Sequence, residues 1–101
     1  MFEIMRIDGE SMSPNYHHGD YVLLLKSKRS LAALKPGDVV AFHQIAYGVM
    51  VKRVQEVEAT SGLVTVIGDN PEHSTDSRLF GPVPVQDVIG KVIWHIGGGG
   101  H

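Results

Sequence analysis

The sequence predicts a mainly β protein, built as one small antiparallel sheet that is curled or partly closed and carries little helix. Short runs rich in β-branched residues alternate with turn residues along almost the whole chain. No long stretch has the spacing of an amphipathic helix. A length of 101 residues fits one domain, which we place at residues 1–96.

The first three strands are expected at residues 2–7, 21–26 and 38–43. Each is an apolar run bounded by residues that favour turns, such as Gly9 after the first strand and Pro36 before the third. These boundaries are too closely spaced for helices, which supports short strands.

Three more strands are expected at residues 48–57, 63–67 and 88–96. Helix is limited to two single turns. One is expected at residues 30–34, and one at residues 13–16, where Ser13 would cap the helix and Pro14 would take its first position.

The tail at residues 97–101 consists of four glycines and a histidine. It has no apolar side chain to pack, so we expect it to be flexible, and its composition is typical of an engineered linker.

Composition excludes several classes of protein. The net charge of −2 argues against a binder of nucleic acid, and the basic stretch at residues 26–29 is interpreted as a solvated loop. The absence of cysteine excludes disulfides, thiolate metal sites and a cysteine nucleophile. No apolar run is long enough to span a bilayer and no secretory signal is present, so we expect a soluble, cytoplasmic chain. Peripheral membrane contact through Leu23, Leu25 or Trp94 stays open, as does the oligomeric state.

Ser11 and Lys52 are the candidate catalytic residues. Ser11 lies in a predicted turn, and a serine hydroxyl becomes a nucleophile when a neighbouring base removes its proton. Lys52 interrupts an apolar strand in which Met50 and Val54 share its face, whereas Arg53 points to the opposite face. Burial among apolar side chains lowers the pKa of a lysine and lets it act as that base. The alternative is an edge-strand lysine that reaches into water.

The six histidines offer another kind of base, but none has the spacing of a catalytic triad, and we interpret them as surface or half-buried residues.

A dense polar loop at residues 68–78 is the third candidate feature. Asp76 and Arg78 are placed to pair and stiffen it, and Ser74 is placed to accept a hydrogen bond from the amine of Lys52. An ordinary hairpin loop is the alternative.

In order and spacing, these segments resemble the conserved boxes of type I signal peptidases from residue 7 to about residue 92. The matching segments are 9–14, 51–54, 68–70 with 74–78, and 81–84 followed by 89–91.

The resemblance implies a serine–lysine endopeptidase on a β-rich fold related to the self-cleaving domains of LexA-type repressors. By matching motif, Ser11 would be the nucleophile and Lys52 the general base. Ser74 would orient the lysine, and Met12 would line the substrate groove near Met50. The remaining loop residues implied to hold the site together are Asp69, Asp76 and Arg78.

Two departures from the family pattern are visible. Many bacterial members carry a serine or threonine where this chain has Gly9, so the oxyanion hole would rest on backbone N–H groups, chiefly that of Ser11. The usual membrane anchor and extra β-domain are also missing from the sequence. The chain is therefore similar to soluble, minimal members, such as the maturation peptidases of nickel-containing superoxide dismutases.

The expected function is removal of an N-terminal leader or signal-like peptide from a precursor protein, with small residues such as alanine before the cut. No metal or organic cofactor is expected, and no nucleic acid partner. The alternatives are a self-cleaving regulatory domain and a non-catalytic peptide-binding module on the same fold.

Overall fold

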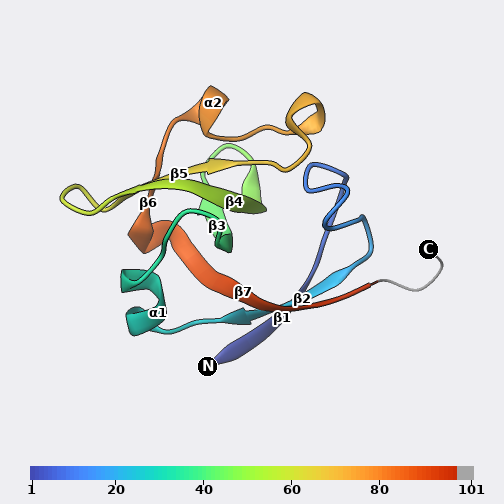
Figure 1. Cartoon of the computed structure of the whole chain (residues 1–101), viewed down its shortest axis with the longest axis horizontal. Helices are drawn as coiled ribbons and strands as arrows, with labels where there is room; N and C mark the ends of the chain where they lie inside the picture. Colours follow the sequence, from blue (N-terminus) through green and yellow to red (C-terminus); the bar gives the residue numbers. More distant parts are fainter. Residues whose placement is uncertain (98–101) are drawn as a thin grey trace.

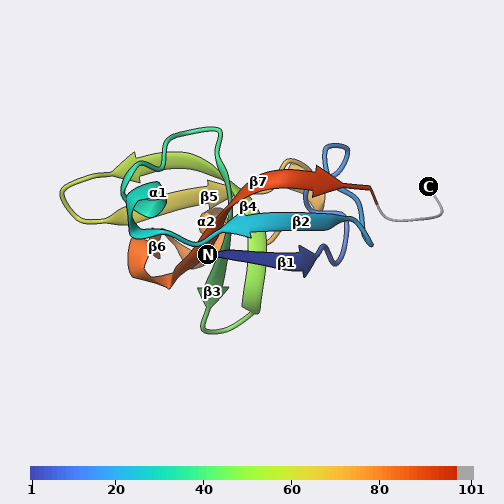
Figure 2. The same cartoon turned by 90° about the horizontal axis from the view of Figure 1, so that it is seen from below.

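The chain forms a single seven-stranded antiparallel sheet, as Figures 1 and 2 show. The computed structural model describes residues 1–97, so the tail predicted at residues 97–101 lies, apart from its first residue, outside the described part. The strands are β1 (Phe2–Arg6), β2 (Tyr21–Leu25), β3 (Val39–Gln44), β4 (Gly48–Glu58), β5 (Leu63–Ile67), β6 (Val83–Pro84) and β7 (Val88–Ile96).

The order of strands across the sheet is β1-β2-β7-β3-β4-β5-β6. The outermost strands, β1 and β6, do not pair with each other, so the sheet is open. The prediction of a mainly β, antiparallel fold is confirmed. All six predicted strands are present with bounds that differ by at most one residue. Burial alternates along β2 and β5, whereas the first four residues of β3 are all buried.

Irregular pairing curls the sheet. The register shifts between Leu23 and Leu24, between Ala41 and Phe42, and between Val54 and Glu56. Such bulges increase the local twist of a sheet. As a result β1, β2 and β7 lie side by side in one half of the molecule, and β3, β4 and β5 turn away from them in the other (Figures 1 and 2).

Two apolar clusters fill the sheet on either side of β3 and β4. The larger cluster includes Phe42 and Val54, and the smaller includes Leu24 and Ala41. Because Phe42 and Ala41 are neighbours that point to opposite faces of β3, this one strand takes part in both clusters. Met50, Val54 and Val57 of β4 contribute to the larger cluster, and Lys52 lies on β4 between the first two.

The helical predictions need correction at two places. The expected turn at residues 30–34 is instead α1 (Lys28–Ala32), capped by Ser27, whose hydroxyl accepts the N–H of Ser30 at 3.0 Å. The basic stretch at residues 26–29 is therefore not a loop, since its second half begins this helix.

The predicted helical turn at residues 13–16 is wrong. Residues 11–15 form tight turns, and the Ser13–Pro14 peptide bond is cis. The hydrogen bonds of this segment start one residue earlier than predicted, because the carbonyl of Met12 accepts the N–H of Tyr16 at 2.9 Å. Ser13 is therefore not a helix cap, and the carbonyl of Ser11 accepts the N–H of Asn70 at 2.8 Å.

Four short elements between residues 71 and 87 were not predicted. They are the 3-10 turns η1 (Pro71–His73) and η2 (Val85–Asp87), the helix α2 (Ser77–Phe80), and strand β6. Asp76 caps α2 by accepting the N–H of Arg78. β6 contains Pro84, which an edge strand tolerates because its missing N–H breaks no internal ladder.

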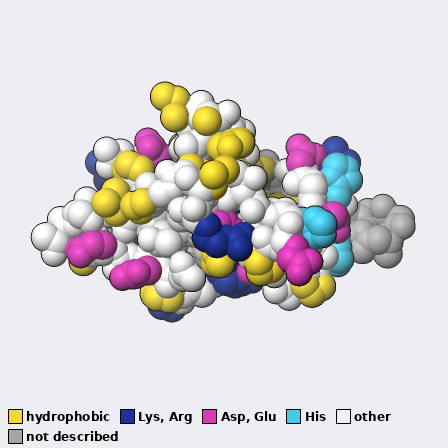
Figure 3. All heavy atoms as spheres, turned by 90° about the horizontal axis from the view of Figure 1, so that it is seen from above, with side chains coloured by type: hydrophobic (Ala, Val, Ile, Leu, Met, Phe, Trp, Pro, Cys, Tyr) yellow, Lys and Arg dark blue, Asp and Glu magenta, His cyan; other side chains and the backbone are white. Residues whose placement is uncertain are grey.

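No helix within residues 1–97 has the length and apolar character needed to cross a bilayer. The surface view in Figure 3 shows histidine side chains gathered toward one end of the molecule, whereas carboxylate side chains lie at both ends.

Candidate active site

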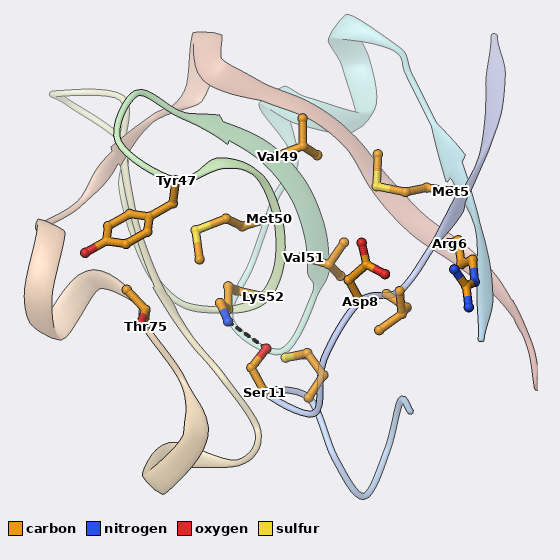
Figure 4. Close-up of a pocket in the computed structure, with 12 residues that line it drawn as sticks. Met5, Arg6, Asp8, Ser11, Tyr47, Val49, Met50, Val51, Lys52 and Thr75 are labelled. Atoms are coloured by element: carbon orange, nitrogen blue, oxygen red, sulfur yellow. Dashed lines mark hydrogen bonds between the residues drawn. The ribbon is translucent and has the colours of Figure 1, made fainter. Parts of the chain in front are cut away.

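The fold brings Ser11 and Lys52 together. The turn after β1 presents Ser11, and β4 presents Lys52, so that Lys52 Nζ and Ser11 Oγ lie 2.7 Å apart in a hydrogen bond (Figure 4). A neutral amine at this distance can accept the proton of the hydroxyl.

Lys52 lies on an interior strand and only 3% of it is exposed, so the alternative of an edge-strand lysine reaching into water is wrong. Met50 and Val54 on the same face pack against the larger apolar cluster, as strand alternation predicted. Burial lowers the pKa of Lys52; the carboxylate of Asp76 opposes this effect, and the cation of Arg78 adds to it.

Asp76 organises the polar loop. It is 1% exposed, and its carboxylate accepts hydrogen bonds from the Gly68 N–H at 2.9 Å, the Ser74 hydroxyl at 2.8 Å and the Arg78 guanidinium at 2.9 Å. Burial alone would raise the pKa of Asp76, but these hydrogen bonds outweigh it and hold that pKa well below its usual range. The carboxylate is therefore ionised, and its charge is matched by Arg78 rather than by Lys52.

The loop is thus not an ordinary hairpin loop. Residues 71–73 and 77–80 are helical turns within it, and Asp76 ties them to β5 through Gly68.

Ser74 lies against the backbone of Gly68. A Cβ built on Gly68 would stand 2.1 Å from Ser74 Oγ and 2.7 Å from the carbonyl oxygen of Ser11, so only glycine fits there. The Ser74 hydroxyl donates to Asp76, and the hydrogen bond that Lys52 makes within the described residues goes to Ser11. Orientation of Lys52 by Ser74 therefore stays a prediction.

A second set of polar contacts, centred on Asp69, supports the turn that carries Ser11. Asp69 makes a two-point ion pair with Arg53, at 2.8 Å and 2.7 Å, and accepts the side-chain amide of Asn15 at 2.9 Å. Burial would raise the pKa of Asp69, but the hydrogen bonds from Arg53 and Asn15 lower it below its ordinary value. As predicted, Arg53 points to the face of β4 opposite Lys52, and it pairs with Asp69 on that face.

Asn70 completes this network. Its N–H donates to the carbonyl of Ser11 at 2.8 Å, and its side-chain amide donates to the carbonyl of Glu10 at 3.1 Å. Sequence reasoning missed the roles of Asn15, Arg53 and Asn70. The polar segment 68–70 pointed to the loop, but nothing local indicated which distant residues it would contact.

A groove of about 320 Å³ runs past Ser11 and Lys52. Figure 4 shows Tyr47, Met50 and Thr75 on one side of the pair, with Asp8, Arg6 and Met5 on the other.

The two methionines predicted near the groove, Met12 and Met50, both line it. Met12 is almost fully buried, and its sulfur accepts the N–H of Asp69 at 3.4 Å, so it forms the floor beneath the serine turn. Gly9 does not line the groove; it has φ of +79°, which glycine adopts easily, and it shapes the turn two residues before Ser11.

Within residues 1–97, no three His, Asp or Glu side chains gather in a way that could hold a metal ion. The polar side chains that line the groove beside Ser11 and Lys52 are those of Arg6, Asp8, Tyr47 and Thr75.

Comparison with known proteins agrees with this arrangement. A profile of the peptidase S24-like family matches residues 3–93. The chain belongs to the peptidase S24-like family. The mitochondrial ATP-independent inner membrane protease subunit 1b of Arabidopsis thaliana is 37% identical to this S24-like chain over 60 residues, which cover 59% of the chain and 34% of the relative. The S24-like chain thus spans about a third of that relative's length. Both findings support a peptidase function and confirm the broad family that the motifs indicated.

Proposed function

We propose that the chain is a serine endopeptidase in which Ser11 and Lys52 form a catalytic dyad and which removes an N-terminal leader from a precursor protein. The observation that carries the proposal is the 2.7 Å contact between a buried lysine amine and a serine hydroxyl at the wall of a groove. Family membership and the protease relative support the same class of reaction.

In the proposed reaction, Ser11 Oγ attacks the scissile carbonyl while Lys52 Nζ takes its proton. Backbone N–H groups at the serine turn, chiefly that of Ser11, stabilise the oxyanion of the tetrahedral intermediate. Collapse of this intermediate expels the amine, which receives the proton from Lys52 and leaves an acyl-enzyme. Water then gives a proton to Lys52 and attacks the ester, and Ser11 recovers its hydrogen as the acid product departs.

Unpaired strand edges support an extended substrate. Among the described residues, β1 pairs only with β2, and residues 48–52 of β4 pair only with β3, because β5 begins its pairing at Arg53. Residues 5–8 and 47–52 line the groove on its two sides. A peptide in β conformation can add to such edges through backbone hydrogen bonds. Small side chains before the cut, such as alanine, suit the space left beside Met50.

The finer substrate assignment follows from the resemblance to minimal signal peptidases. A leader-bearing precursor of a nickel-containing superoxide dismutase is the first substrate to test. Cytoplasmic location and the absence of a nucleic acid partner stay predictions.

The direct test is mass spectrometry of leader-bearing precursors incubated with the protein. We expect one specific cut by the parent and none by Ser11→Ala or Lys52→Ala. Ser13→Ala and Lys28→Ala are matched controls, since Ser13 lies two residues from the nucleophile and Lys28 is an exposed lysine on α1. Full cleavage by either dyad variant would rule out the dyad.

A non-catalytic peptide-binding module is the alternative. It needs no buried amine with a lowered pKa, so the site of Lys52 favours the enzyme. Binding of the leader without cleavage, equally strong in the parent and in Ser11→Ala, would favour the module.

A further inference from the structure

The residues just before Ser11 are held by a histidine pair that the proposed reaction does not use. His17 and His18 follow the serine turn, and three hydrogen bonds join them to it. Gly9 N–H donates to His18 Nδ1 at 3.0 Å, His18 N–H donates to Glu10 Oε2 at 2.7 Å, and His17 Nδ1 lies 3.2 Å from Glu10 Oε1. Both residues that precede Ser11 are thereby tied to one short segment.

One of these bonds depends on protonation in a definite way. A backbone N–H can only donate, so His18 Nδ1 must present its lone pair to Gly9. A proton on Nδ1 replaces that lone pair with a second donor, and the bond to Gly9 is lost. Histidine is the side chain that gains a proton between about pH 5 and 8.

The surroundings offer a protonated His18 another partner. Asp8 Oδ1 lies 3.9 Å from His18 Nδ1. Asp8 and Glu10 of the turn are the charged groups that contact His18. Arg6 of β1 approaches the adjacent Gly19, and Asp20 accepts the N–H of the adjacent His17. Two arrangements therefore compete for one nitrogen: Gly9 binds it when the imidazole is neutral, and Asp8 attracts it when the imidazole is charged.

We propose that His18 is a positioning residue: its neutral imidazole holds the turn that presents Ser11 to Lys52, and protonation of the ring releases that hold. The inference rests on the proposed peptidase function. The rate of the reaction then falls at low pH for two separate reasons. Protonation of Lys52 disables the base, and protonation of His18 releases the turn that positions the nucleophile.

Two variants distinguish the hydrogen bond between Gly9 and His18 from the protonation of His18. In His18→Asn the amide oxygen replaces Nδ1 as acceptor but takes up no proton in this range. In His18→Ala the acceptor is gone at every pH. His43→Asn is the matched control, since His43 is exposed on β3 and lines a different pocket.

The kinetic readout is kcat/KM from pH 5 to 9 on an internally quenched peptide with alanine just before its scissile bond. At pH 8, His18→Asn is expected to match the parent, and His18→Ala to lose about five-fold in kcat, the effect of one ordinary hydrogen bond. Toward the acidic end of this range the ratio of His18→Asn to parent is expected to rise to about five-fold, because protonation of the ring removes the bond in the parent as well. A ratio of His18→Asn to parent that does not change with pH, as expected of His43→Asn, overturns the inference.

The second readout needs no turnover. In the 15N-labelled parent, the amide resonance of Gly9 is expected to shift as the ring of His18 takes up its proton, and to stay still in His18→Asn. If the amide resonance of Gly9 does not shift when His18 takes up its proton, the inference is overturned whether or not the peptide is cut. Absence of cleavage by the parent at every pH would instead count against the proposed function, and the Gly9 titration then decides the positioning contact alone.

Discussion

Replacement of Lys52 by methionine distinguishes a neutral catalytic amine from a charged structural one. Methionine has nearly the length of lysine and no titratable group, and its apolar side chain suits the company of Met50 and Val54. Because Lys52 is almost fully buried and its pKa is lowered by that burial, the charged form of the amine is less favourable in the folded protein than in the unfolded chain. Lys52→Met is therefore expected to keep or raise the stability of the fold while activity falls by at least about 10³-fold.

The sign of the pH effect follows from proton binding. Between the lowered pKa of Lys52 in the folded state and the ordinary value of ~10.4, the unfolded chain holds one more proton than the folded chain. In that window the free energy of unfolding of the parent rises by about 1.4 kcal/mol per pH unit from this group, and Lys52→Met lacks the rise. The stability advantage of the variant is thus greatest at and below the folded pKa and disappears as pH approaches 10.

The measurement is urea denaturation followed by circular dichroism from pH 6 to 10, with Lys28→Met as the exposed control. Kinetics on the same samples give the loss of activity. A Lys52→Met protein that is less stable than the parent at pH 7, with an unchanged dependence on pH, would show that Lys52 is charged and ion-paired, and the reasoning would fail.

Three further predictions concern the residues around the dyad. Arg78→Met removes a cation that lowers the pKa of Lys52, so the acidic limb of the plot of kcat/KM against pH is expected to move to higher pH. Gly68→Ala places a Cβ 2.7 Å from the carbonyl oxygen of Ser11 and is expected to cost about 1–3 kcal/mol of stability in denaturation experiments, with at least a ten-fold loss of kcat. Asn70→Ala removes the side-chain bond to the carbonyl before Ser11 and is expected to lower kcat about five-fold in steady-state kinetics, with KM little changed.

Each of these has an outcome that contradicts it. Arg29→Met, on the exposed face of α1, is the control for lost positive charge, and an equal displacement of its pH profile would remove the special role of Arg78. A Gly68→Ala protein with parental kcat would mean that the serine turn tolerates displacement. A rise in KM alone in Asn70→Ala would place Asn70 in substrate binding rather than in positioning the turn.

The strands could be predicted because each carries its own signal. In β2 and β5 buried and partly exposed residues alternate strictly, and glycine, proline or aspartate marks the ends of most strands. The elements that were missed have no such local signal. α2 has only four residues and begins at the Asp76 cap, and β6 contains a proline. Both exist because contacts with β5 stabilise them, and the sequence pattern does not contain those contacts.

The candidate site likewise has features that the sequence predicts and features that it does not. Strand alternation separated Lys52 from Arg53 and placed Lys52 among apolar side chains, and the structure has both features. The helical turn expected at residues 13–16 was wrong: the backbone forms tight turns that start at Met12, whose carbonyl accepts the N–H of Tyr16. The contact from the N–H of Asn70 to the Ser11 carbonyl joins segments far apart in the sequence, and no local pattern predicts it.

Lys52 and Arg53 are consecutive residues of β4, and this explains how the turn that carries Ser11 is held close to Lys52. On one strand, neighbouring side chains point to opposite faces, so β4 directs the amine of Lys52 to Ser11 and a permanent cation to Asp69. Asp69 in turn holds Asn15, on the far side of the serine turn. These contacts connect the serine turn to β4, the strand that carries Lys52. The ion pair of Arg53 and Asp69 lies on the opposite face of β4, where its charge does not disfavour the neutral form of Lys52. Two consecutive residues of one strand thus serve different parts of the site: Arg53 connects the serine turn to β4 through Asp69, and Lys52 faces the hydroxyl of Ser11.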